Sequence, residues 1–139
     1  MGKMIGLLIL AERKLGIGLI DAAVHTLGSR PPQLEATDLD YAASPEHVDA
    51  LLRQNLQKVD DGEGALILAD VYGATHTNVA CRLLVRGRIE LITGVNLPML
   101  LRVLNYRHLK MDDLIDKALS GGSGGIICAA NPEKVRGAR

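Results

Sequence analysis

Two uninterrupted apolar runs constrain the fold of this chain more than any other feature. They read MIGLLIL (residues 4–10) and ALILA (65–69). A run of this kind, bounded by turn signals, indicates a strand that is covered on both faces, as strands of parallel sheets are. IELITGVN (89–96) adds a third core strand, and QLEATDL (33–39) a shorter and weaker one.

Stretches with helical apolar spacing follow these strands. Ser44 and Pro45 form a strong helix start, and Pro98 opens another helix. The alternation of strand and helix occurs four times and ends in one last short strand, GGIICAA (124–130). This order predicts an α/β fold: an open, mainly parallel, doubly wound sheet of about five strands with helices on both faces.

The length of 139 residues and the absence of a long linker predict one domain, which we place at residues 4–130. The polar residues 131–139 are expected to form a loose tail. Met4 is a candidate natural start, which would make residues 1–3 an added extension. The glycines of GGSGG (121–125) are expected to be a flexible lead into the last strand.

Composition argues against several classes of function. Aromatic residues make up only 2% of the chain, and sixteen basic residues balance sixteen acidic ones, so a nucleic-acid-binding protein is not expected. The chain has no apolar stretch of membrane-spanning length, and its start lacks a signal-peptide core. We therefore expect a cytoplasmic protein that does not insert into a membrane, and we expect no cofactor.

A binding site is predicted at the carboxyl ends of the strands. Open α/β sheets bind ligands there, where the strand order reverses. In the common order 2-1-3-4, the first and third strands are neighbours, and the residues at their exits are Glu12 and Asp70. Nearby glycines and helix N-termini suit an anion, which favours phosphate chemistry.

Three segments carry a resemblance to a known family: MIGLLIL, GALILADVYGATHTN and ITGVNLPMLLRVL. Together they resemble the enzyme IIA domain of the mannose/fructose/sorbose class of bacterial sugar phosphotransferase systems. The resemblance extends from about residue 4 to residue 127. The pattern D-x-x-G-[GA]-[ST]-x-x-N is its most specific part, and its members here are Asp70, Gly73, Ala74, Thr75 and Asn78.

The resemblance implies a homodimer in which a C-terminal strand, here GGIICAA, crosses antiparallel to the partner's sheet. It also implies a phosphocarrier cycle. A histidine after the first strand accepts a phosphoryl group from the phosphocarrier protein HPr and passes it to a IIB domain. The aspartate that ends the third strand, here Asp70, orients that histidine.

The chain departs from the family pattern at three positions. Glu12 replaces the acceptor histidine, Arg13 replaces the glycine beside it, and His76 stands where the family commonly has proline. Neutral imidazole has a free lone pair near pH 7, whereas a carboxylate is ionised and offers only oxygen. We therefore expect a relay-deficient member retained for regulation or partner binding, in which Glu12 imitates a phosphoryl group in part. Arg13 is expected to pair with Glu12 or Asp70.

Other interpretations of the same residues stay open. Glu12, Asp70 and His76 would together suit a divalent metal or a general acid and base. His76 would alternatively be a relocated phosphoryl acceptor. In the simplest alternative these residues have structural roles only. Glu12 and Arg13 form an exposed ion pair, Asp70 is a strand-end cap, and Thr75 and Asn78 cap a helix.

Overall fold

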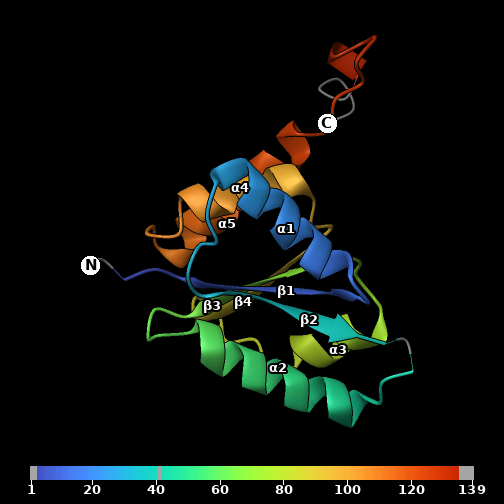
Figure 1. Ribbon diagram of the computed structural model, residues 1–139, viewed down its shortest axis with the longest axis vertical. Helices are drawn as coiled ribbons and strands as arrows, with labels where there is room; N and C mark the ends of the chain where they lie inside the picture. Colours follow the sequence, from blue (N-terminus) through green and yellow to red (C-terminus); the bar gives the residue numbers. More distant parts are fainter. Residues whose placement is uncertain (1–2, 41, 135–139) are drawn as a thin grey trace.

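The sheet of the computed structural model, which describes residues 3–40 and 42–134, consists of four parallel strands (Figure 1). Their spatial order is β2-β1-β3-β4. The strand order therefore reverses at β1: β2 lies on one side of it, and β3 and then β4 lie on the other. This confirms the predicted fold class and the predicted neighbours. The strands are β1 (Gly6–Glu12), β2 (Leu34–Leu39), β3 (Ala65–Ala69) and β4 (Ile89–Thr93).

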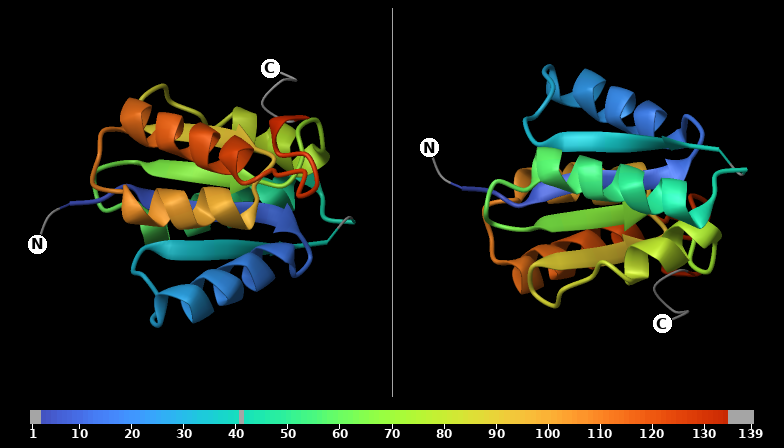
Figure 2. Two further views of the ribbon diagram at one scale, coloured as in Figure 1. Left: turned by 90° about the horizontal axis from the view of Figure 1, so that it is seen from above. Right: turned by 90° about the horizontal axis from the view of Figure 1, so that it is seen from below.

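Five helices cover the two faces of the sheet (Figure 2). Helices α1 (Leu15–Leu27), α4 (Leu97–Asn105) and α5 (Met111–Gly124) pack on one face. Helices α2 (Pro45–Val59) and α3 (Thr75–Cys81) pack on the other. None of the helices in the described part of the chain is long and apolar enough to cross a membrane.

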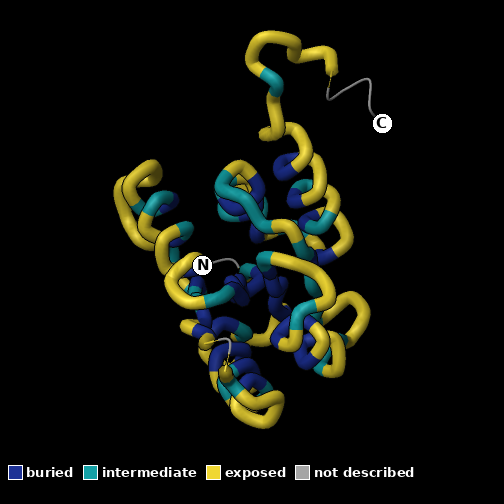
Figure 3. The backbone as a smooth tube through the Cα atoms, turned by 90° about the vertical axis from the view of Figure 1, so that its right-hand side faces the viewer, coloured by how far each residue is buried: buried dark blue, intermediate teal, exposed yellow. Residues whose placement is uncertain are grey.

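Strand β1 is the centre of the core. Leu7, Ile9 and Ala11 face the side of α1, α4 and α5, whereas Leu8 and Leu10 face α2 and α3. All five are fully buried, and each large side chain buried in this way stabilises the fold by roughly 1.5–3 kcal/mol. Figure 3 shows the buried residues gathered around the sheet and the exposed ones on the outer helix faces. The core therefore holds the end of β1 rigidly.

The predicted helix starts are confirmed. The Ser44 hydroxyl accepts a hydrogen bond from the amide of His47 at 3.1 Å, and Pro45 is the first residue of α2. In α4 the Asn96 side chain accepts from the amide of Met99 at 2.9 Å, with Pro98 in the first turn. In each case a side-chain oxygen satisfies a helix amide that has no partner within the helix.

The C-terminal region differs from the prediction. Helix α5 continues to Gly124, and the predicted fifth strand at 124–130 is not formed in the single chain. A Cβ atom at Gly121 or Gly122 would collide with the side chains of Arg102 and Met99 on α4, so these glycines allow close helix packing. They are helical rather than a flexible lead. Exchange of a strand with a partner stays a prediction, and residues 135–139 of the predicted tail lie outside the described residues.

Candidate functional site

The exits of β1 and β3 lie side by side. Glu12 is the last residue of β1, and Asp70 directly follows β3. One carboxylate oxygen of Asp70, Oδ2, accepts the backbone amide of Glu12 at 3.0 Å, and the other, Oδ1, accepts the amide of Val71 at 2.8 Å. The parallel pairing of β1 with β3 thus brings the two predicted carboxylates together.

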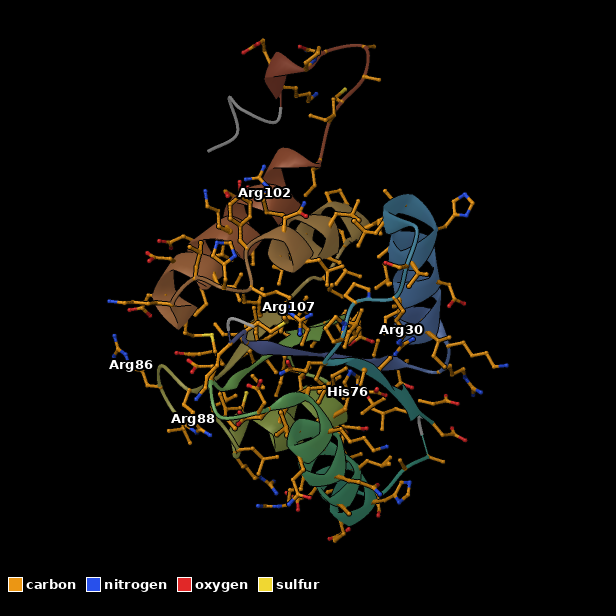
Figure 4. All side chains as sticks on the ribbon, turned by 60° about the vertical axis from the view of Figure 1, so that its left-hand side comes forward. Arg30, His76, Arg86, Arg88, Arg102 and Arg107 are labelled. Atoms are coloured by element: carbon orange, nitrogen blue, oxygen red, sulfur yellow. The ribbon has the colours of Figure 1, made fainter. Side chains whose placement is uncertain are left out.

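His76 lies between these two carboxylates. It is the second residue of α3, its residue exposure is 3%, and Figure 4 labels it beside the sheet. Its Nε2 atom lies 2.7 Å from Oδ1 of Asp70, and its Nδ1 atom lies 3.4 Å from Oε1 of Glu12. We call these three residues the Glu12–His76–Asp70 cluster. The predicted trio is present, with the imidazole bridging the carboxylates.

The carboxylate of Glu12 points into the protein. Its side chain is 18% exposed, and its Oε2 atom is buried without a hydrogen-bond partner among the described residues. Because Oε1 faces His76, neither oxygen is presented to solvent in the way a surface phosphoryl group would be. The partial imitation of a phosphoryl group by Glu12 therefore finds no support in this geometry.

Arg13 pairs with a residue that the sequence did not indicate. Its guanidinium lies 3.9 Å from Oδ1 of Asp40, after β2, and both side chains are 67% exposed. This ion pair replaces the predicted pairing with Glu12 or Asp70. Arg13 also has a φ of +50°, a left-handed conformation that favours glycine. A glycine would adopt this conformation at a lower energetic cost than Arg13 does.

Asp70 has a perturbed pKa. Burial alone would raise the pKa of its carboxyl group, but the hydrogen bond from His76 and those from the amides of Glu12 and Val71 favour the charged form. The net result is a pKa below the ordinary value of 3.8. Asp70 is therefore a carboxylate at neutral pH, and the Nε2 atom of His76 donates to it.

The rest of the predicted motif shapes the loop between β3 and α3. Gly73 adopts a φ of +87°, and Ala74 precedes α3 without a side-chain cap. Thr75 is the exposed first residue of α3. The side-chain amide of Asn78 donates to the carbonyl of Gly73 over 3.5 Å, which is long for a hydrogen bond. Neither Thr75 nor Asn78 therefore acts as the predicted helix cap.

The geometry gives the metal-binding alternative no support. Within residues 3–40 and 42–134, no group of three or more histidine, cysteine or acidic residues is arranged to hold a metal ion. The local reason is the orientation of His76, because each ring nitrogen is directed at a different carboxylate. The ligand atoms of the Glu12–His76–Asp70 cluster are paired with one another and do not converge on a shared position.

A parallel sheet of order β2-β1-β3-β4, with ionisable residues at the two strand exits beside the reversal, defines a doubly wound α/β protein with a site at its switch point. The chain belongs to the mannose-type family described as "PTS system fructose IIA component", where PTS is the phosphotransferase system. The family model matches residues 6–119.

Individual relatives agree with this assignment. The chain is 37% identical over 87 residues to the "PTS system fructose-specific EIIA component" of Bacillus subtilis, which covers 60% of the chain and 59% of that relative. It is 26% identical over 113 residues to the "Transcriptional regulatory protein LevR" of the same organism, covering 78% of the chain and 12% of that protein. The chain thus spans less than two thirds of the length of either relative.

A solved structure shares the fold. The phosphotransferase system component EIIA from Streptococcus agalactiae superposes with a TM-score of 0.82 at 24% identity, covering 92% of the chain and 99% of that structure. At this identity the likeness shows the fold alone.

Proposed function

We propose that this protein is an enzyme IIA-type component that does not relay a phosphoryl group and acts through partner binding as a regulator. The observation that carries the proposal is the position of Glu12. It stands at the exit of β1, where the family resemblance places the acceptor histidine, and its carboxylate is turned inward against His76. The phosphoryl group would otherwise come from an HPr-like carrier and go on to a IIB domain.

The chemistry of the acceptor supports this proposal. Attack on phosphorus requires a lone pair that points toward the incoming group, with the attacking and leaving atoms in line. Here Oε1 of Glu12 faces the imidazole, and Oε2 is buried. A carboxylate held in this way offers no accessible nucleophile, so transfer at a carrier's rate is not expected.

A relocated acceptor at His76 is not favoured. Both ring nitrogens lie against carboxylate oxygens, at 2.7 Å and 3.4 Å, and the residue is almost fully buried. The ring would have to leave both carboxylates before either nitrogen could reach phosphorus. General acid–base catalysis is not favoured for the same reason, because the nitrogen that does not face Asp70 faces Glu12 instead of a substrate.

Two observations support a regulatory, partner-binding function. The first is the similarity to a protein named as a transcriptional regulator, in which the matched region is a small part of the whole. The second is the exposed surface at the strand exits, where Val71 and Tyr72 after β3 are 54% and 77% exposed and Arg13 and Lys14 after β1 are also exposed. Such a mixture of apolar and basic side chains suits an HPr-like or IIB partner. A homodimer, as the family resemblance implies, is part of this proposal.

The proposal is tested by incubating the protein with phosphoenolpyruvate, enzyme I and HPr and measuring acid-labile phosphate. A mannose-type IIA domain that keeps its acceptor histidine serves as the positive control. We expect no labelling of this chain, together with measurable binding of HPr in a titration. Labelling at the rate of the control would refute the relay deficiency, and failure to bind both HPr and a IIB domain would refute the partner-binding function.

A further inference from the structure

We propose that His76 is a positioning residue that blocks the site independently of Glu12. Because the imidazole engages both carboxylates, restoring a histidine at position 12 alone would leave the site unable to accept a phosphoryl group. Removal of His76 is required as well. This inference rests on the proposed function and concerns the same site, but it makes a separate prediction.

Asp70 already accepts three hydrogen bonds, one of them from an imidazole. Its Oδ2 atom accepts the amide of Glu12, and its Oδ1 atom accepts both the amide of Val71 at 2.8 Å and Nε2 of His76 at 2.7 Å. An acceptor imidazole needs one nitrogen held by a hydrogen bond so that the lone pair of the other points outward. Oδ1 of Asp70 already accepts from the imidazole of His76, so a ring introduced at position 12 would have to compete with His76 for this carboxylate.

The side chain at position 12 lies against the same ring. Since the ionised Asp70 can only accept, Nε2 of His76 donates to it, and Nδ1 is the ring nitrogen that remains for position 12. Oε1 of Glu12 lies 3.4 Å from Nδ1, so the side chain at position 12 is in contact with the ring that is bound to Asp70.

The contact between Glu12 and His76 changes with the residue at position 12. Replacing Glu12 by an imidazole would remove the negative charge beside His76 and place two rings at the same contact. Two neutral imidazoles there share one hydrogen bond at best, and a protonated pair repels. We expect the 2.7 Å bond from His76 to Asp70 to persist in either arrangement, because His76 is 3% exposed and is held in this position by α3.

The experiment compares four proteins in the assay with phosphoenolpyruvate, enzyme I and HPr. They are the unaltered chain, Glu12→His, His76→Pro and the double variant Glu12→His/His76→Pro. Proline is tolerated in the first turn of a helix, and position 76 is the second residue of α3. In productive transfer the N–P bond of phospho-HPr breaks, a new N–P bond forms on the introduced imidazole, and the carrier's imidazole is the leaving group.

We expect the double variant to be labelled at least about 100-fold faster than Glu12→His, an effect smaller than the roughly 10⁴-fold loss seen when a catalytic histidine loses its orienting carboxylate. His76→Pro alone should not be labelled, because Glu12 is still present. As a matched control, Glu12→His/His47→Ala removes an exposed histidine from α2 and should behave like Glu12→His. A Glu12→His variant as fast as the double variant would overturn the inference, and so would a folded double variant that stays silent.

A second measurement tests the inference if the double variant Glu12→His/His76→Pro does not fold. The ring nitrogens of Glu12→His are assigned by ¹⁵N NMR, with Glu12→His/His76→Ala as the alternative double variant. We expect Nε2 of His76 to keep its bond to Asp70 in the single variant, and the introduced ring to take that bond only when His76 is absent. An introduced ring bonded to Asp70 in the presence of His76 would overturn the inference. Labelling of the unaltered chain would instead count against the proposed function alone.

Discussion

The two ends of the sheet each bury charge, and they hold it in different ways. At the amino ends of the strands, Arg107 is 4% exposed and donates to three backbone carbonyls: Ile5 at 3.0 Å, Pro32 at 2.6 Å and Gln33 at 2.7 Å. At the carboxyl ends, the members of the Glu12–His76–Asp70 cluster contact one another through their side chains, and two backbone amides also donate to Asp70. Figure 4 labels Arg107, in the connection between α4 and α5, and His76, on α3.

The difference between the two ends decides how each responds to substitution. A backbone carbonyl is present whatever residue occupies the position, so the partners of Arg107 do not depend on neighbouring side chains. In the Glu12–His76–Asp70 cluster each group is the partner of another, and a change in one alters the state of the others. The amino end is therefore expected to be structural and insensitive to changes in the neighbouring side chains. At the carboxyl end, a change in one side chain is expected to affect the others. Three predictions test this contrast.

The largest effect is expected at the amino end. Replacing Arg107 by methionine removes three hydrogen bonds from a charged donor and leaves the buried carbonyl of Ile5 and two part-buried carbonyls without it, so the free energy of unfolding should fall by about 3–4 kcal/mol. Burial lowers the pKa of Arg107 to about 10, with Asp61 opposing the shift, so the group is still charged at neutral pH. Urea unfolding measures the change.

The control for this prediction is Arg86→Met, which alters an exposed arginine in the connection before β4 and should change stability by less than about 0.5 kcal/mol. A loss below about 1 kcal/mol for Arg107→Met would contradict the structural role given to the carbonyl contacts.

A smaller effect, with a characteristic pH dependence, is expected at the carboxyl end. Asp70→Asn should lower the free energy of unfolding by about 2 kcal/mol at pH 7, because the cluster loses the charge that faces His76. The folded pKa of Asp70 lies below its unfolded value near 3.8, so its contribution is fully present above that pH and is lost as the pH falls through the folded pKa.

The difference in stability between the unaltered chain and Asp70→Asn should consequently shrink below about pH 3.8, as followed by urea unfolding across the acid range. Asp116→Asn changes an exposed position of α5. It should neither lower the free energy of unfolding at neutral pH nor show a difference from the unaltered chain that becomes smaller in acid. A difference that is constant from pH 7 to pH 3 would show that Asp70 contributes through packing alone.

Much of the fold could be predicted from local patterns, because they record burial directly. The apolar run of β1 indicates burial on both faces, and Ser44, Pro45 and Pro98 lie at the starts of the helices that they predicted. The meeting of Glu12 with Asp70 was also predictable, because parallel strands end at one edge of the sheet.

The errors arose where tertiary contacts override local preference. Glycine is a poor helix former, so the run at 121–125 indicated a flexible segment, yet the packing of Gly121 and Gly122 against α4 keeps it helical. The ion pair of Arg13 with Asp40 depends on the conformation of two connections, which periodicity does not record. Arg107 gave no signal at all, because an arginine in the connection after a helical segment is usually exposed.

The smallest effect tests whether Arg13 belongs to the coupled carboxyl end or only lies beside it. Its φ of +50° costs a non-glycine residue about 1 kcal/mol, which Arg13→Gly would relieve. The greater freedom of glycine in the unfolded chain and the loss of the exposed ion pair with Asp40 offset part of the gain, so a net stabilisation of about 0.5 kcal/mol is expected. Gly73→Ala is the matched control of opposite sign, because φ is +87° there and an added Cβ meets no neighbour. If Arg13→Gly instead destabilises the fold by more than about 1 kcal/mol, the side chain of Arg13 supports the cluster, and the coupled region extends to Asp40.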